Sequence, residues 1–121
     1  MDAELDPEDA KIITLARATR ARAGGGGGAA VRDSTGRTYA AVDVDLDAVS
    51  LTALQLAVAM AFSSGGTRLE AAAVVNPEGE RELLDGELAA AWELGAAHVL
   101  LAGPDGALLR VYPNPDHAAQ A

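Results

Sequence analysis

The feature that most constrains the fold is a stretch of twenty residues, 48–67, without a single acidic or basic side chain. Within it, apolar residues recur at helical spacing over 50–62, which predicts a helix with apolar side chains on nearly all sides. Such a helix must be buried on nearly all sides, so we expect a sheet against one flank and another layer or subunit against the other. The apolar run is too short to cross a bilayer, which takes roughly 20 residues.

The composition indicates one domain with a core of small side chains. The 121 residues suit a single domain, 1–121, whose core we place at about residues 7–112, followed by a tail at 113–121. Hydrophobic residues make up 50% of the chain but aromatic residues only 3%, so alanine, leucine and valine must fill the interior. Because each of these buries little area, we expect a homo-oligomer, a dimer or tetramer, to add the missing burial.

The charge and the cysteine count exclude several classes of function. A net charge of −9 disfavours nucleic acid and anionic membrane surfaces as partners, because both require a basic surface. The chain has no cysteine, so it forms no disulfide and offers no thiolate to a metal. Its first residues are acidic, unlike the basic start of a secretory signal peptide, and we expect a cytoplasmic protein.

The first part of the chain predicts a capped helix followed by a linker. Asp6 is suited to cap a helix that begins at Pro7, and Gly24 is suited to end it. Five consecutive glycines, 24–28, follow this helix and precede a strand-like run. A phosphate-binding loop follows a strand and opens a helix, so we interpret the glycines as a flexible linker.

A β-hairpin with an acidic end is predicted next. Runs of strand-forming residues at 29–33 and 37–45 flank the turn residues Ser-Thr-Gly at 34–36. Asp43, Asp45 and Asp47 alternate at the end of the second run, which places their carboxylates close together. This pattern would suit a weak divalent-cation site, but it lacks the spacing of a calcium loop, and we favour a solvated strand end.

The second half of the chain predicts three more strands and one more helix. We expect strands at 69–75, 98–102 and 107–112, and a helix with Leu84, Leu88 and Trp92 on its apolar face, ended by Gly95. The sequence leaves open whether Asp85 caps this helix or whether residues 80–82 already belong to it. The order α-β-β-α-β-α-β-β predicts an α/β fold, a mixed five-stranded sheet with helices on both faces. The two histidines do not suggest a metal site, since we place His98 at a strand edge or core rim and His117 in the tail.

Six short strings carry a family resemblance in their order and spacing. They are Gly-Ala-Ala-Val at 28–31, Gly-Arg-Thr-Tyr at 36–39, Val-Asp-Val-Asp at 42–45, Ser-Gly-Gly at 64–66, Ala-Ala-Val-Val at 72–75 and Gly-Pro-Asp-Gly at 103–106. Together with the central helix they resemble the cytidine deaminase family, small dimeric or homotetrameric zinc enzymes that include the blasticidin-S deaminases. The resemblance covers about residues 7–112 and implies a three-layer α-β-α fold.

The catalytic motifs of that family are missing from this chain. Zinc deaminases hold the metal with one His or Cys and a Pro-Cys-x-x-Cys motif, and a Glu moves the proton. The resemblance places Thr52, Leu84 and Glu87 at the three ligand positions and Leu54 at the position of the catalytic Glu. Leu84 cannot bind a metal and Leu54 cannot carry a proton. We therefore expect no metal and no cofactor.

The substrate side of the family site is altered as well. The resemblance places Asp43 and Asp45 where the family has an Asn and a Glu that grip the ribose. We favour a catalytically inactive homologue with a structural or regulatory role and an unknown protein partner. One alternative is a nucleoside- or sugar-binding module lined by Asp43, Asp45, Thr52 and Glu87. Two others are an enzyme with new acid–base chemistry at Glu87 and Thr52, and a hydrolase that retains the family activity.

Overall fold

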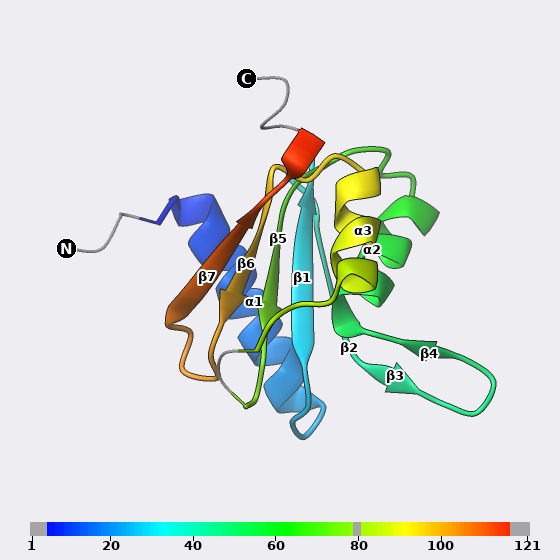
Figure 1. The fold of residues 1–121 in the computed structure, drawn as a ribbon, viewed down its shortest axis with the longest axis vertical. Helices are drawn as coiled ribbons and strands as arrows, with labels where there is room; N and C mark the ends of the chain where they lie inside the picture. The colour runs from blue at the N-terminus through cyan, green and yellow to red at the C-terminus, as the bar shows by residue number, and fades with distance from the viewer. Residues whose placement is uncertain (1–4, 79–80, 117–121) are drawn as a thin grey trace.

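A five-stranded mixed sheet forms the centre of the molecule in the computed structural model, which describes residues 5–78 and 81–116 (Figure 1). The elements are α1 (Pro7–Arg22), β1 (Gly28–Asp33), β2 (Thr38–Val42), β3 (Val44–Asp45), β4 (Ser50–Leu51), α2 (Ala53–Ser63), β5 (Leu69–Val75), α3 (Asp85–Glu93), β6 (His98–Ala102) and β7 (Leu108–Pro113). The strand order is β2-β1-β5-β6-β7. Only β5 and β6 run parallel, and the other neighbours are antiparallel. The predicted mixed sheet is confirmed.

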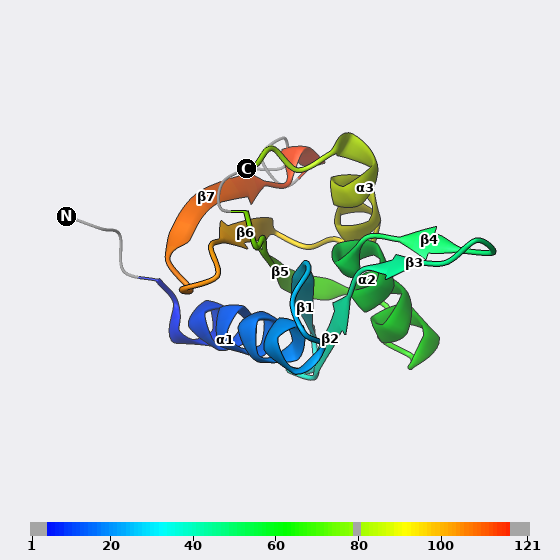
Figure 2. The ribbon, with the colours of Figure 1, turned by 90° about the horizontal axis from the view of Figure 1, so that it is seen from below.

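Helices cover both faces of the sheet, as the sequence predicts (Figure 2). Helix α1 packs Ile12, Ile13 and Ala16 on one face, against alanines and valines of β1 and β5. Helices α2 and α3 pack on the other face, where Leu54 and Leu101 belong to the larger core cluster. Alanine at many sheet positions lets the helices approach closely, which explains how a chain with so few aromatic residues closes its core.

Local sequence determines how α1 begins. The Asp6 carboxylate accepts a hydrogen bond from the Glu8 amide at 2.8 Å, and Pro7 occupies the first helical position. Gly24 follows the helix with a φ of 89°, a conformation that glycine adopts without strain. Both boundary predictions are confirmed.

The predicted long strand 37–45 and the predicted helix start at residue 50 are wrong. Strand β2 ends at Val42, and the chain then forms a separate two-stranded arm in which β3 pairs with β4. Helix α2 consequently begins at Ala53, with Thr52 as its N-cap. The sequence over 44–51 suits either a strand or the start of a helix, and the pairing of β3 with β4 favours strands.

The central helix α2 is less covered than its sequence predicts. The side chains that face the sheet are buried, whereas Met60 is 37% exposed and Phe62 is 63% exposed. Within one chain, the sheet and α3 therefore bury the inner face of α2, and the outer face of α2 is exposed to solvent. No helix in the described ranges 5–78 and 81–116 is long and apolar enough to cross a membrane.

Two further expectations need correction. Leu84 precedes α3 as its N-cap residue and is 65% exposed, so it is not part of the apolar face, whereas Leu88 is buried. Residues 113–116 do not form a loose tail, because β7 includes Pro113 and the buried Asn114 donates to the Ala96 carbonyl oxygen at 2.8 Å. Helix α3 begins at Asp85 with Leu84 at the N-cap, so Asp85 is not the cap, and residues 81–82 are not helical. The remaining tail, with His117, lies outside the described residues.

Candidate functional site

A cavity of about 320 Å³ lies between the end of β5, the start of α2 and the loop that leads into α3. Parallel neighbours β5 and β6 end on this side, so the loop after β5 brings polar residues to the starts of two helices. The lining consists of Gly26, Gly27, Asp43, Ala53, Val74, Val75, Asn76, Pro77, Glu78, Arg81 and Glu87. Apolar and polar side chains both line it, as in binding pockets for small molecules, although its volume is at the small end of their range.

Asp43 joins the glycine loop to the start of α2. One carboxylate oxygen accepts a hydrogen bond from the Ala53 amide at 2.8 Å, and the other accepts one from the Gly27 amide at 3.1 Å. A carboxylate at this point also interacts favourably with the positive end of the helix dipole. A side chain at position 27 would meet this carboxylate, since a Cβ there would lie 2.8 Å from Oδ2. Gly27, the fourth of the five glycines and one of the two that line the cavity, is therefore required for close approach, in addition to any linker role.

Thr52 and Gln55 cap α2 reciprocally. The Thr52 hydroxyl accepts from the Gln55 amide at 3.1 Å, and the Gln55 side-chain oxygen accepts from the Thr52 amide at 3.0 Å. The Gln55 side-chain nitrogen then donates to the Gly86 carbonyl oxygen at 3.3 Å, which ties α2 to the first turn of α3. The Thr52 hydroxyl is thus used in the cap, and Thr52 is not among the residues that line the cavity.

Glu87 is held by three hydrogen bonds on its two oxygens. Arg81 approaches with both terminal nitrogens, Nη1 to Oε1 at 3.0 Å and Nη2 to Oε2 at 2.9 Å. The Leu84 amide donates to Oε1 at 2.9 Å, which caps the start of α3. Glu87 is only 2% exposed, whereas the Arg81 side chain is 40% exposed. A planar guanidinium matches a carboxylate in this two-point geometry.

The net electrostatic effect keeps Glu87 ionised. Burial alone would raise the pKa of the Glu87 carboxyl, but hydrogen bonds from Arg81 and the Leu84 amide outweigh it and lower the pKa below its ordinary value. The same pairing, against the opposing effect of burial, raises the pKa of Arg81, and the negative charge of Asp43 adds to the rise. Arg81 therefore stays positive and lies within the field of both carboxylates.

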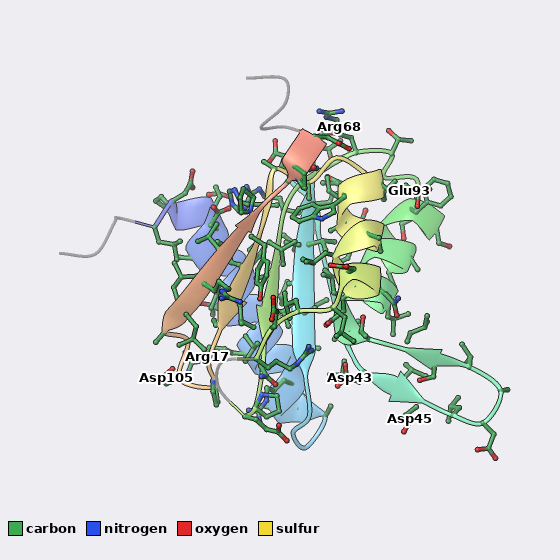
Figure 3. The ribbon with its side chains drawn as sticks, viewed as in Figure 1. Arg17, Asp43, Asp45, Arg68, Glu93 and Asp105 are labelled. Atoms are coloured by element: carbon green, nitrogen blue, oxygen red, sulfur yellow. The ribbon has the colours of Figure 1, made fainter. Side chains whose placement is uncertain are left out.

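The structure brings only some of the predicted site residues together. Asp43 and Glu87 both line the cavity, but Asp45 is exposed on the β3–β4 arm, farther from the domain than Asp43 (Figure 3). Leu54 is fully buried in the core between α2 and the sheet, and the exposed Leu84 does not line the cavity. The two leucines therefore do not fill the cavity.

Sequence reasoning missed three polar residues of the cavity, Asn76, Glu78 and Arg81. Asn76 is 5% exposed at the end of β5, and its backbone amide donates to the Ala102 carbonyl oxygen at 3.0 Å. A polar residue directly after a buried strand signals the mouth of a site in an α/β sheet. No local signal identifies Arg81, because its partner lies six residues on and across a loop.

The residues at this site do not fit a zinc ion. Among the described residues, no three His, Asp or Glu side chains are grouped so that they could hold a metal. His98 lies elsewhere, with Nε2 2.8 Å from Asp9 Oδ2 beneath α1, at the rim of the core. Glu87 would have to leave Arg81 to ligate a metal. The other two ligand positions that the family resemblance implies hold Thr52, whose hydroxyl caps α2, and Leu84.

Comparison with solved structures establishes the fold class. The chain is similar to the cytidine deaminase from Burkholderia pseudomallei, with a TM-score of 0.74 and 23% identity over 88% of this chain and 92% of that chain. It is similar to the enzyme from Mycobacterium leprae (TM-score 0.66, 20% identity, 88% and 93% covered) and to that from Mycobacterium tuberculosis (0.62, 23%, 89% and 94%). The domain therefore has the three-layer α/β fold of cytidine deaminases.

The family follows from a second comparison. A family model described as cytidine deaminase-like matches residues 5–106, and the chain belongs to this family. A search of curated proteins finds no significant match. The resemblance stated from the short strings of sequence is thereby confirmed at the level of fold and family.

Proposed function

We propose that this protein is a catalytically inactive cytidine deaminase homologue, with a structural or regulatory role on the deaminase scaffold. The observation that carries this proposal is the ion pair between Arg81 and Glu87. Glu87 stands at a position where the family resemblance implies a zinc thiolate, and both of its oxygens are used by Arg81. An arginine bound to that position favours a site without a metal.

The position of the catalytic Glu supports the same conclusion. The family resemblance assigns this position to Leu54, which is fully buried in the core. A leucine side chain cannot transfer a proton between water and a base. Without three ligands to hold a zinc ion, no bound water is acidified for attack. The proposed loss therefore affects both the metal and the proton carrier.

Zinc content and turnover test this proposal together. The purified protein, exchanged into zinc-containing buffer and then desalted, is analysed by inductively coupled plasma mass spectrometry and assayed with cytidine by absorbance. The cytidine deaminase from Burkholderia pseudomallei serves as the positive control. We expect substoichiometric zinc and no turnover above buffer. One zinc per chain with measurable deamination of cytidine contradicts the proposal.

The cavity supports a second candidate, a nucleoside- or sugar-binding module without catalysis. Asp43, Asn76, Val74 and Pro77 line the cavity. Carboxylate and amide groups form hydrogen bonds with sugar hydroxyls. Titration calorimetry with cytidine and with ribose, up to millimolar concentration, tests it. We expect Asp43→Asn to weaken a genuine signal and Asp45→Asn, on the arm, to leave it unchanged. No heat with either ligand rules the module out.

New acid–base chemistry at Glu87 and Thr52 has less support. A general base needs a free oxygen and a pKa near the working pH, whereas Glu87 has a lowered pKa and two occupied oxygens. The Thr52 hydroxyl accepts the Gln55 amide in the helix cap.

We also propose that copies of this chain associate through the outer face of α2. Met60 and Phe62 are exposed there, on a helix with no acidic or basic residue, so two chains of net charge −9 can meet at this face with little repulsion. Sedimentation velocity tests it: we expect a dimer or tetramer, shifted toward monomer in Phe62→Lys but not in the control Leu109→Lys on β7. A wild-type monomer at micromolar concentration excludes this interface. We keep the cytoplasm as the proposed location.

A further inference from the structure

The cavity places two carboxylates at the starts of two neighbouring helices. Asp43 is bound to the first amide of α2, and Glu87 lies in the first turn of α3. The Gln55–Gly86 hydrogen bond holds these two helix starts together. A buried carboxylate such as Glu87 is strongly unfavourable unless a positive charge compensates it.

Among the residues that the structure describes, Arg81 is the only basic one that lines this cavity. Its guanidinium neutralises Glu87 directly and is stabilised by the charge of Asp43 as well. Its Nη1 also lies 3.4 Å from the Glu82 carbonyl oxygen, which helps to orient the group above the start of α3. Within the described ranges, three acidic side chains line the cavity, so the charge of its described lining is −2 with Arg81 and −3 without it.

We propose that Arg81 takes the electrostatic place that a metal ion would have in this fold: it is a covalently attached cation that neutralises Glu87 at the start of α3, beside Asp43 at the start of α2. The chain thus compensates its buried carboxylate permanently, without depending on a supply of metal. A divalent cation that approached Glu87 would have to displace a guanidinium from both oxygens. This inference rests on the proposed function, because a zinc ion bound by Glu87 would have to displace Arg81 from both of its oxygens.

Chemical rescue distinguishes a required cation from a side chain that only fills space. Arg81→Ala removes the guanidinium and leaves Glu87 buried without a counter-charge. We expect its thermal midpoint to fall by roughly 5–15 °C relative to wild type. The matched control is Arg22→Ala, which removes an exposed arginine near the end of α1 and is expected to leave the midpoint unchanged.

The rescue itself compares a cation with its neutral analogue. We expect about 20 mM methylguanidinium to raise the thermal midpoint of Arg81→Ala by about 3 °C or more. We expect the same concentration of methylurea to have no effect. Neither compound should shift wild type or Arg22→Ala. If Arg81→Ala is unfolded at 25 °C, the same two compounds are compared by the folded fraction that they restore.

The double variant Arg81→Gln, Glu87→Gln supplies an independent measurement. Because it removes both charges together, we expect it to melt above Arg81→Ala. Equal rescue by methylurea, or an Arg81→Ala midpoint equal to that of Arg22→Ala, overturns the inference. Such a result does not change the zinc content or the turnover. Failure of this inference is therefore distinguishable from failure of the proposed function.

Discussion

Asp9 of α1 and His98 of β6 are 89 residues apart in sequence, and their Oδ2 and Nε2 atoms lie 2.8 Å from each other. The other Asp9 oxygen lies 3.1 Å from Arg32 Nη1 of β1, without the alignment of a hydrogen bond. Arg32 in turn donates to Glu70 of β5 at 2.8 Å. One buried carboxylate thus attaches the first turns of α1 to the sheet.

Replacing Asp9 tests this attachment. Asp9→Ala leaves Arg32 without its buried partner, so we expect the free energy of unfolding to fall by about 2–4 kcal/mol. Urea unfolding followed by circular dichroism measures the change. Glu70→Ala is the matched control on the same arginine: its carboxylate is 49% exposed, so its loss should cost less than about 1 kcal/mol. Equal effects of the two variants would contradict the assignment.

Acid should destabilise the protein through Glu87. Because its pKa is lower in the folded chain than in the unfolded chain, its contribution to stability is present above the unfolded pKa, about 4.3, and is lost as the pH falls through the folded value. We expect the wild-type unfolding free energy to decline below about pH 4.5. Glu87→Gln should be less stable at pH 7 and show a shallower decline, measured by urea unfolding between pH 7 and pH 3.

Asp33 should contribute to the same acid sensitivity. Its carboxylate, 2% exposed, accepts hydrogen bonds from the Thr35 hydroxyl at 2.6 Å and from the amides of Thr35 and Arg37, and these lower its pKa against the effect of burial. We expect Asp33→Ala to cost about 1–3 kcal/mol at pH 7, because several donors of the β1–β2 turn lose their acceptor. The difference from wild type should shrink below about pH 3.9, where the unfolded Asp is protonated. A constant difference across that range would refute this role.

Gly28 should not tolerate a side chain. A Cβ at this position would lie 2.6 Å from the Ala16 carbonyl oxygen, a backbone atom that cannot move without shifting α1 from the sheet. We expect Gly28→Ala to lower the unfolding free energy by about 2 kcal/mol or more. Gly86→Ala is the control, since nothing lies within 4 Å of its Cβ position in the first turn of α3. That variant should be neutral or slightly stabilising, because alanine is the better helix former.

Elements specified by neighbouring residues could be read from the sequence. Asp6 and Pro7 define the start of α1 within a few residues, and apolar runs such as 69–75 and 98–102 define the strands, because capping and burial patterns are local properties. The family followed from several strings in order. The absence of any thiolate was also a matter of composition alone.

Other features depended on contacts between distant segments. The β3–β4 arm replaced the predicted start of α2 because two short strands paired, and Leu84 turned to solvent because the chain enters α3 at that point. The role of Asp43 depends on the tertiary structure, because the fold brings the glycine loop and the start of α2 to either side of its carboxylate.

The sequence by itself therefore determined the layers of the fold and the absence of any thiolate, because helix capping, hydrophobic spacing and composition need no knowledge of distant residues. Only the tertiary structure decided which charge compensates the buried Glu87. The Arg81–Glu87 pair forms because a guanidinium and a carboxylate were brought together out of water, where the burial of one charge requires the other.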